Sequence, residues 1–290
     1  MTRKLDIVGA GKVGRTLARL WARAGVFRIG CVVNRSIESS QAAVNFIGEG
    51  IPVERISEIS TLDVLMISTS DRSIEECAQS IAQGRKALPG AVAFHCSGSL
   101  SSDNLCALKQ IGCHIGSVHP VKSFAEPTRE VSTFDGTFCA VEGDNSAITC
   151  LQEAVVRIGG RSFEVDKTGK VIYHAGSVFA SNYLTAAIYA GLRCLEKAGL
   201  PHTQAMEALH QIVIGTIGNV FKLGPVQALT GPISRGEVEL VSRELEALSQ
   251  WQPDIADAYK AVGVLVLEMA VAQNGATDSD LGEIRRVLIA

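Results

Sequence analysis

Short apolar runs alternate with stretches of helical periodicity through the first 166 residues of the chain. The runs have the length of buried strands and cover 4–9, 28–33, 63–68, 91–96, 113–118, 137–141 and 162–165. Helical stretches lie between most of them, notably at 13–24, 72–83, 103–110 and 146–158. Strands that alternate with helices predict an α/β fold with a mostly parallel, doubly wound sheet and right-handed crossovers.

The pattern changes after residue 166, where strand-like runs stop. Helical periodicity then dominates, with breaks that contain glycine or proline between the segments 170–198, 202–223, 237–248, 253–273 and 279–288. We therefore expect an all-α helical-bundle domain at 167–290 after an α/β domain at 1–166, with the junction at 159–169.

A glycine motif directly follows the first predicted strand and precedes the first predicted helix. In this context G-x-G-x-x-G is typical of a Rossmann dinucleotide-binding domain. Gly9 would allow the tight turn, Gly11 the approach of a pyrophosphate, and Gly14 the close packing of helix on strand. Free backbone N–H groups and the helix dipole would then face the phosphates, at Gly9, Ala10, Gly11, Lys12, Val13 and Gly14. The alternative is a glycine-rich turn with no ligand.

The end of the second predicted strand bears on the choice of cofactor. An NAD site usually has Asp or Glu here, on the ribose 2′-hydroxyl, but the chain reads Asn34-Arg35-Ser36. Arg35 can pair with a 2′-phosphate that a carboxylate would repel. The residues therefore favour NADP(H), unless Arg35 is only a solvated surface residue.

Small and polar residues follow three later strands, at the edge where open parallel sheets bind ligands. We expect Ser68, Thr69 and Ser70 to lie against the cofactor, Ser68 and Thr69 near the nicotinamide ribose, and Ser97 near the substrate. His119 follows the next strand and precedes a proline, which disfavours helix there. His119 could orient the substrate or donate a proton. The alternative is that its ring only hydrogen-bonds to the turn.

The first helix of the second half carries a row of polar residues. Lys170, His174, Ser177 and Ser181 share one face at helical spacing, with Asn182 beside it. Polar groups on an apolar helix at a domain junction should be paired or used, and Lys170 or His174 could supply a proton as hydride arrives. A hydrogen-bonded seam or a subunit contact is the alternative.

A turn near residue 232 is a third candidate. Thr230 or Ser234 could cap the following helix, and Arg235 could bind a substrate carboxylate as a fork. The alternative is a capped turn with a surface arginine.

Composition narrows the class of protein. A length of 290 residues favours two domains, and a net charge of −3 gives no sign of a nucleic-acid partner. No apolar run reaches the roughly 18 residues that cross a membrane, and the glycine motif lies too near the N-terminus for a cleaved signal peptide. The eight cysteines are scattered without a C-x-x-C pair. We expect reduced thiols of a cytoplasmic protein, with no metal site.

The order of several motifs resembles one bacterial family. In that family a Rossmann-like domain precedes an α-helical domain of unknown function, and its members are commonly described as NADP oxidoreductases. The architecture is more distantly similar to ketopantoate reductase, pyrroline-5-carboxylate reductase and 3-hydroxyisobutyrate dehydrogenase, which act on small carboxylates. The resemblance covers nearly the whole chain and rests on Gly9–Gly14, Ser97-Gly98, His119-Pro120, Tyr173-His174-Ala175, Ser181-Asn182 and Leu229–Gly236.

The resemblance implies a helical domain, of the 6-phosphogluconate dehydrogenase type, that closes over the nicotinamide and often forms the dimer. The related hydroxyacid dehydrogenases use a lysine on the first helix of that domain, with an asparagine one turn on. Lys170 occupies a comparable stretch, but position 174 is His and the nearest asparagine is Asn182. Which of Lys170 and His174 is the acid therefore stays open.

We expect an NADP(H)-dependent oxidoreductase that transfers a hydride to or from a small keto, imino or hydroxy acid in a cleft between the domains. A homodimer is expected because the long apolar helices exceed what one small bundle can cover. Three alternatives remain: an NADP(H)-binding sensor without turnover, a reductase that exchanges hydride with a deazaflavin, and a purely structural dimerisation role for the helical half.

Overall fold

The computed structural model describes residues 2–290, and the chain divides into two compact units between Asn182 and Tyr183. The first unit holds every strand of the described chain together with the first helices. The second unit is helical. An α/β domain followed by helices is what the sequence predicts.

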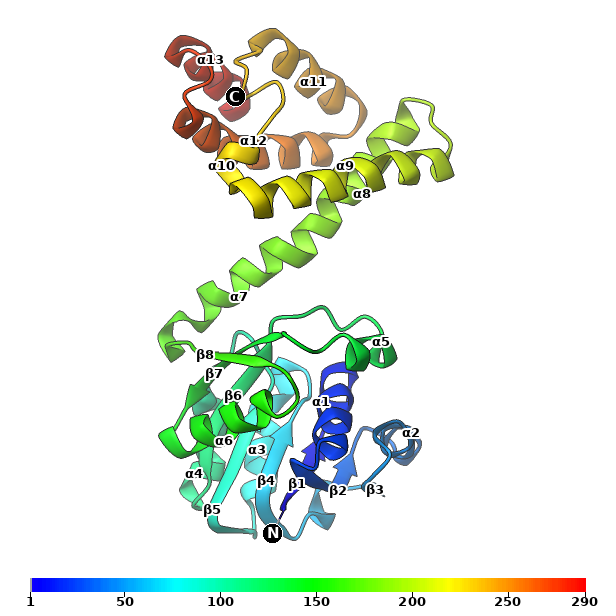
Figure 1. The fold of residues 1–290 in the computed structure, drawn as a ribbon, viewed down its shortest axis with the longest axis vertical. Helices are drawn as coiled ribbons and strands as arrows, with labels where there is room; N and C mark the ends of the chain where they lie inside the picture. Colours follow the sequence, from blue (N-terminus) through cyan, green and yellow to red (C-terminus); the bar gives the residue numbers. More distant parts are fainter. Residues whose placement is uncertain (1) are drawn as a thin grey trace. The chain divides into compact units, whose positions relative to one another are not determined.

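One eight-stranded sheet organises the first unit (Figure 1). Its spatial order is β3-β2-β1-β4-β5-β6-β7-β8, and within the described residues only the β6–β7 pairing is antiparallel. The predicted mostly parallel, doubly wound sheet is confirmed. The strands are β1 Arg3–Val8, β2 Phe27–Val33, β3 Ile51–Val53, β4 Thr61–Ile67, β5 Lys86–His95, β6 His114–Pro120, β7 Phe138–Gly143 and β8 Arg161–Glu164.

Both faces of the sheet are covered because successive side chains on a strand point to opposite sides. On β4, Val64 and Met66 belong to one apolar core, whereas Leu65 and Ile67 belong to another. The first core packs under α1 (Lys12–Arg23), α2 (Ile37–Ile47) and α6 (Asn145–Val156). The second packs under α3 (Ile74–Ala82) and α4 (Cys106–Gln110).

Three elements of this unit were not among the predicted ones, namely β3, α2 and the short α5 (Pro127–Ser132). β3 has only three residues, one of them Pro52, so it gives little alternation to detect. α2 starts at a local signal, because Ser36 and Ser39 form a reciprocal capping box. It ends at Gly48, whose φ of 90° is left-handed.

The helix at the junction contains a π-helical turn between two α-helical segments. The predicted helix 170–198 is α7 (Lys170–Val178), a π-helical turn (Phe179–Tyr183) and α8 (Leu184–Lys197). π-turns inside helices are uncommon and occur often near functional sites.

The second unit contains five further helices. Four of them follow predicted segments to within three residues, namely α9 His202–Leu223, α11 Val238–Trp251, α12 Pro253–Gln273 and α13 Asp278–Ile289. The short α10 (Pro225–Ala228) was not predicted, because its Pro225 follows Gly224 and reads as a break. The core of the second unit is built from α11, α12 and α13, with Val241, Leu267 and Ile284 among the buried side chains.

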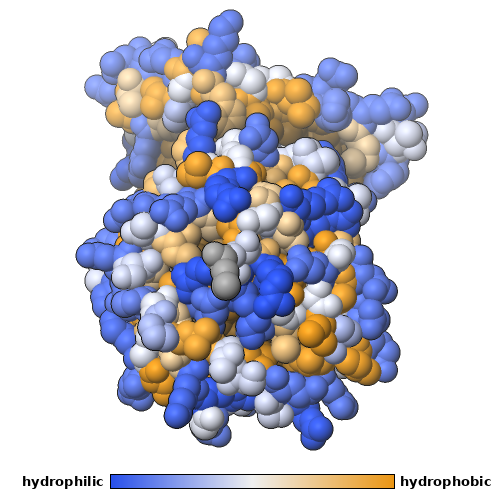
Figure 2. All heavy atoms as spheres, turned by 60° about the horizontal axis from the view of Figure 1, so that its bottom comes forward, coloured by the Kyte–Doolittle hydropathy of each residue, from blue (hydrophilic) through white to orange (hydrophobic). Residues whose placement is uncertain are grey.

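No helix within residues 2–290 is long and apolar enough to cross a membrane. On the face of the first unit that Figure 2 presents, hydrophilic residues surround separate smaller apolar patches.

Candidate functional site

The glycine motif forms a tight loop between β1 and α1, and two of its glycines are required by sterics. Gly9 has φ +83°, and a Cβ on it would lie 2.6 Å from Thr69 Cγ2. A Cβ on Gly14 would lie 2.9 Å from Ser68 Oγ. The loop therefore sits directly against the residues that follow β4.

Gly11 differs from the other two glycines because a Cβ there would meet nothing within 4 Å. Gly11 is the N-cap of α1 and makes no side-chain cap, so the backbone N–H groups that open the helix are not satisfied by a cap. Open space beside a helix N-terminus is what a pyrophosphate requires. The loop thus fits the phosphates of a dinucleotide.

Asn34 fixes the loop from the end of β2. Its Oδ1 accepts a hydrogen bond of 2.7 Å from Ala10 N–H, and its Nδ2 donates to the Ser39 carbonyl at 2.8 Å. The Ala10 N–H therefore donates to a side chain of the protein and is not free for a phosphate. Arg15 stabilises the same loop, because its Nε donates hydrogen bonds to the carbonyls of Ala10 and Gly11.

A groove of about 830 Å³ runs from this loop past the end of β2. Arg35 lines it together with Arg55 and Arg72, two arginines that the sequence did not single out. Ser36 does not line the groove, because its hydroxyl caps α2 by accepting from Ser39 N–H. Ser39, on the first turn of α2, does line the groove.

A second hollow of about 430 Å³ adjoins the groove. The two share Gly11, Ser68, Thr69 and Ser70, so they form one continuous depression in the first unit. The far end of the second hollow is lined by Cys96, Ser97, Gly98, His119 and His174.

Two imidazoles converge on Gly98 in the second hollow. A Cβ on Gly98 would lie 2.6 Å from His174 Nδ1 and 2.9 Å from His119 Nε2, so no larger residue fits there. The two rings meet edge to face with centroids 5.8 Å apart. Burial, followed by the nearby His174 and Lys170, lowers the pKa of His119 to about 4. His119 is therefore neutral at pH 7.

Hydrogen bonds to Asp71 and His95 hold the Ser97–Ser99 loop. Asp71 accepts hydrogen bonds from the hydroxyls of Ser97 at 2.7 Å and Ser99 at 2.8 Å. Ser97 N–H donates to Nδ1 of the buried His95, whose Nε2–H donates to the Ser101 carbonyl at 3.0 Å. Burial lowers the pKa of His95 to about 4, so this ring is also neutral.

Lys170 is 2% exposed and lies beneath the hollow rather than in its lining. Its Nζ donates to Ser117 Oγ at 2.6 Å and to the Ser97 carbonyl at 3.1 Å, and it lies 3.7 Å from Glu142 Oε1. Desolvation lowers the pKa of Lys170, while Glu142 acts in the opposite direction. Glu142 also accepts from the Ser102 hydroxyl at 2.9 Å.

The remaining polar residues of the junction helix are less enclosed. Ser177 is half-buried and its side chain hydrogen-bonds to the Tyr173 hydroxyl. Ser181 and Asn182 lie in the π-turn and are exposed. The structure thus brings His174, but not Lys170, to the wall of the hollow.

Thr230 and Arg235 lie in the second unit. Arg235 is exposed, and its guanidinium already binds both carboxylate oxygens of Glu237, at 2.6 and 3.2 Å. The prediction that Thr230 or Ser234 caps the next helix is wrong. The N-cap of α11 is Glu237, which makes no side-chain cap, and the Ser234 hydroxyl donates to the Gly231 carbonyl at 2.9 Å.

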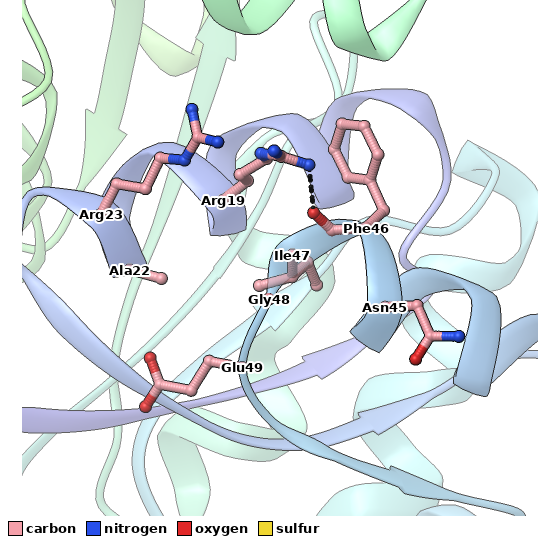
Figure 3. Close-up of a pocket in the computed structure, with 8 residues that line it drawn as sticks. All are labelled: Arg19, Ala22, Arg23, Asn45, Phe46, Ile47, Gly48 and Glu49. Carbon is pink, nitrogen blue, oxygen red and sulfur yellow. Dashed lines mark hydrogen bonds between the residues drawn. The ribbon is translucent and has the colours of Figure 1, made fainter.

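Other features of the first unit offer less chemistry. A separate hollow of about 310 Å³ lies where α1 and α2 end, and Arg19 there donates to the Phe46 carbonyl at 2.5 Å (Figure 3). None of the predicted site residues lines it. Burial raises the pKa of Cys96 to about 12, which keeps this thiol protonated. No metal-binding cluster of His, Cys, Asp or Glu occurs among residues 2–290.

Sequence reasoning missed Asp71, His95, Glu142 and Tyr173. Asp71 and His95 do stand at strand ends, where a search for polar residues beyond the sheet could have found them. Glu142 lies within β7, and Tyr173 reads as part of an apolar helix face. Glu142 contacts Ser102 and Ser117, and Tyr173 contacts His119, all at least 25 residues away in sequence, so no local pattern reveals these contacts.

The neutral state of His95 makes stability depend on pH. The unfolded chain binds a proton at the usual pKa of 6.5, whereas the folded protein resists it until about pH 4. The contribution of the neutral ring is therefore complete above pH 6.5 and is lost as the pH falls towards 4. Between these values one such group gives a slope of about 1.4 kcal/mol per pH unit in the free energy of unfolding.

Urea unfolding at pH 7, 6 and 5 measures this slope. We expect the free energy of unfolding of the wild type to decrease as the pH is lowered. In His95→Gln the slope of this decrease should be smaller by about 1.4 kcal/mol per pH unit, the contribution of one proton. An unchanged slope in the variant would show that His95 does not resist protonation.

Comparisons with known proteins agree with this architecture. Residues 2–120 match the model of a Rossmann-like domain, and residues 137–265 match that of the domain of unknown function DUF2520. No curated protein gives a significant match.

Three solved structures share the fold over nearly the whole chain. Protein TM1727 from Thermotoga maritima is 25% identical, with 93% of this chain and 99% of that chain covered and a TM-score of 0.71. A Bacteroides fragilis protein described as a "putative NADP oxidoreductase" is 22% identical, with coverage of 93% and 98% and a TM-score of 0.74. The pyrroline carboxylate reductase of Plasmodium falciparum, with NADP bound, is 14% identical, with coverage of 98% of both chains and a TM-score of 0.58.

The two matching domain models follow each other in the order that the motifs indicate, and together they span most of the chain. The protein belongs to the family in which a Rossmann-like domain precedes a DUF2520 domain.

Proposed function

We propose that this protein is an NADP(H)-dependent oxidoreductase that transfers a hydride to or from a small keto, imino or hydroxy acid. One observation carries the proposal: a single depression leads from the glycine loop to two imidazoles. A dinucleotide is an elongated ligand with phosphates in the middle and its reactive ring at one end. A depression with a phosphate loop midway and titratable groups at one end has the matching layout.

The glycine loop would hold the pyrophosphate at the opening of α1, where Gly11 leaves space and the N–H groups have no side-chain cap. Ser68, Thr69 and Ser70 border both parts of the depression and would contact the ribose at the nicotinamide end. The similar proteins of Bacteroides and Plasmodium are described with NADP, which agrees with this layout.

The preference for NADP(H) rests on charge. β2 ends without a carboxylate, and Arg35, Arg55 and Arg72 line the groove beyond it. A ribose 2′-phosphate adds negative charge that guanidinium groups bind strongly. Glu54 and Glu76 also line the groove, but they lie after β3 and in α3 rather than at the end of β2.

The bound cofactor would supply the hydride, and the protein would position the substrate and manage its proton. His119 and His174 meet at Gly98 and are the groups best placed to face a carbonyl oxygen or imine nitrogen. Because Glu142 and Ser117 already engage Lys170, we assign the proton to His174 and a supporting role to Lys170. Ser97 would border the substrate.

Calorimetric titration with NADPH and NADH tests the cofactor site. We expect the wild type to bind NADPH more tightly, and Arg35→Ala to lose roughly tenfold or more in NADPH affinity, about 1.4 kcal/mol. NADH affinity should change little, because it has no 2′-phosphate. Arg28→Ala is the matched control, since Arg28 is exposed on the same strand and does not line the groove.

Two results would contradict this account. If neither nucleotide binds, the oxidoreductase proposal fails and the loop serves another ligand. If Arg35→Ala weakens NADPH and NADH equally, Arg35 does not contact the 2′-phosphate. Nucleotide binding without hydride transfer to any keto or imino acid would favour a sensor instead.

We also propose that the protein is a homodimer formed through its helical half. α8 buries none of its 14 residues and α9 buries only Ala205, although both helices are rich in apolar residues. Phe221 is 87% exposed, and Ile212 and Ile214 are also largely exposed. Apolar surface on this scale is typical of an interface between subunits.

Light scattering coupled to size-exclusion chromatography tests the dimer. The wild type should elute with the mass of two chains, and Phe221→Asp should shift the equilibrium towards one, because burying a carboxylate in an apolar interface is costly. Val156→Asp is a control, since Val156 is an exposed residue of α6 in the first unit. A wild type with the mass of one chain at all concentrations would refute the dimer.

A further inference from the structure

Tyr173 hydrogen-bonds to His119 although it does not line the second hollow. Its hydroxyl oxygen lies 2.7 Å from His119 Nδ1, and the two rings meet at 86° with centroids 5.6 Å apart. Phe163 of β8 also packs edge to face on the tyrosine ring, with centroids 6.1 Å apart. Contacts with two strands of the sheet therefore hold the phenol in place.

We propose that Tyr173 is a positioning residue that keeps His119 in the tautomer with its proton on Nε2, so that a neutral imidazole offers an N–H donor to the substrate. The inference deepens the proposed function and rests on it for the identity of the substrate group, a carbonyl oxygen or imine nitrogen. The state of the imidazole itself can be measured without any substrate.

A hydrogen bond of 2.7 Å joins the Tyr173 hydroxyl to His119 Nδ1, and the tautomer of the ring decides which of the two atoms donates. The hydroxyl oxygen has a second partner in Ser177, and a phenol that accepts from a serine keeps its own O–H to donate. We therefore infer that the phenol O–H donates to Nδ1. Burial raises the pKa of Tyr173 to about 12, so the phenol keeps the proton that it donates.

Ser177 completes this arrangement one helical turn further along α7. Its side chain hydrogen-bonds to the Tyr173 hydroxyl. A phenol can accept one hydrogen bond on its oxygen while its O–H donates another. Ser177 therefore does not compete with Nδ1 for the phenol O–H.

His119 has one ring proton at pH 7, because burial and the nearby His174 and Lys170 lower its pKa to about 4. With Nδ1 occupied as an acceptor, that proton must sit on Nε2. Asp71 acts in the opposite direction but does not overcome burial. Lys122 also lines the hollow, and Tyr173 itself is neutral.

The ring edge of His119 that carries Nε2 borders Gly98 in the lining of the hollow. A Cβ on Gly98 would lie 2.9 Å from both Nε2 and Cε1, so only a glycine lets the ring approach this closely. His174 Nδ1 approaches the same point and is buried without a hydrogen-bond partner among the described residues. A polar substrate atom near Gly98 would satisfy both rings.

The two histidines would then have different roles. A neutral imidazole can stabilise negative charge on the substrate oxygen or nitrogen without giving up its proton at neutral pH. His119 would therefore polarise the substrate. The proton that completes the product would come from His174, as the proposed function assigns it.

Long-range ¹H–¹⁵N correlation spectra of the full-length protein, labelled on the histidine side chains, report the tautomer directly. At pH 7 without ligand, we expect His119 to be neutral with its proton on Nε2. In Tyr173→Phe the acceptor at Nδ1 loses its donor, so the second tautomer should become populated. The His119 pKa should rise by up to about one unit, because only the neutral ring can accept the lost hydrogen bond.

Tyr189→Phe is the matched control, because Tyr189 is an exposed phenol on α8, and it should leave His119 unchanged. The inference is overturned if wild-type His119 has its proton on Nδ1, or if Tyr173→Phe alters neither the tautomer nor the pKa. The wild-type spectrum by itself shows which ring nitrogen of His119 carries the proton, even if the variant folds poorly. Failure of NADPH to bind the wild type would instead refute the proposed function, which keeps the two tests separate.

Discussion

The arrangement of the site depends on one buried cation, the Nζ of Lys170. Lys170 opens α7 and reaches into the sheet, where it donates to Ser117 and to the carbonyl of Ser97 and lies near Glu142. Removing one partner of a buried ion pair costs on the order of 3–5 kcal/mol, because the other charge is left without compensation. This contact fixes the first turn of α7 against β6 and β7. It thereby sets the position of Tyr173 and His174 in the next turn.

The site divides into two electrostatic regions. Around the groove, arginines at the end of β2 and in the loops after β3 and β4 create a positive surface. Around Gly98 the titratable groups are enclosed, and His95 and His119 are held neutral by burial. A charged ligand portion would therefore be bound at one end, while the neutral imidazole of His119 would meet a reacting group at the other. In a low-dielectric pocket, fixed donors of this kind stabilise developing charge more strongly than water does.

Local features were predictable from the sequence, whereas contacts between distant segments were not. The glycine loop followed from the motif and its context, and φ +83° at Gly9 with the space at Gly11 agrees with the predicted roles. Helical spacing placed Lys170 and His174 on one face. It could not reveal that Lys170 lies beneath the hollow, because its partners Ser117 and Glu142 come from separate strands, β6 and β7. The cap of α11 was misjudged because the Ser234 hydroxyl bonds back to Gly231 rather than forward.

A crystal structure of the protein with NADPH bound tests the central claim most directly. The account predicts that the pyrophosphate lies at Gly11, the 2′-phosphate lies near Arg35, and the nicotinamide enters the hollow beside Gly98, His119 and His174. A nicotinamide ring bound away from Gly98, or a nucleotide bound outside the glycine loop, would contradict it.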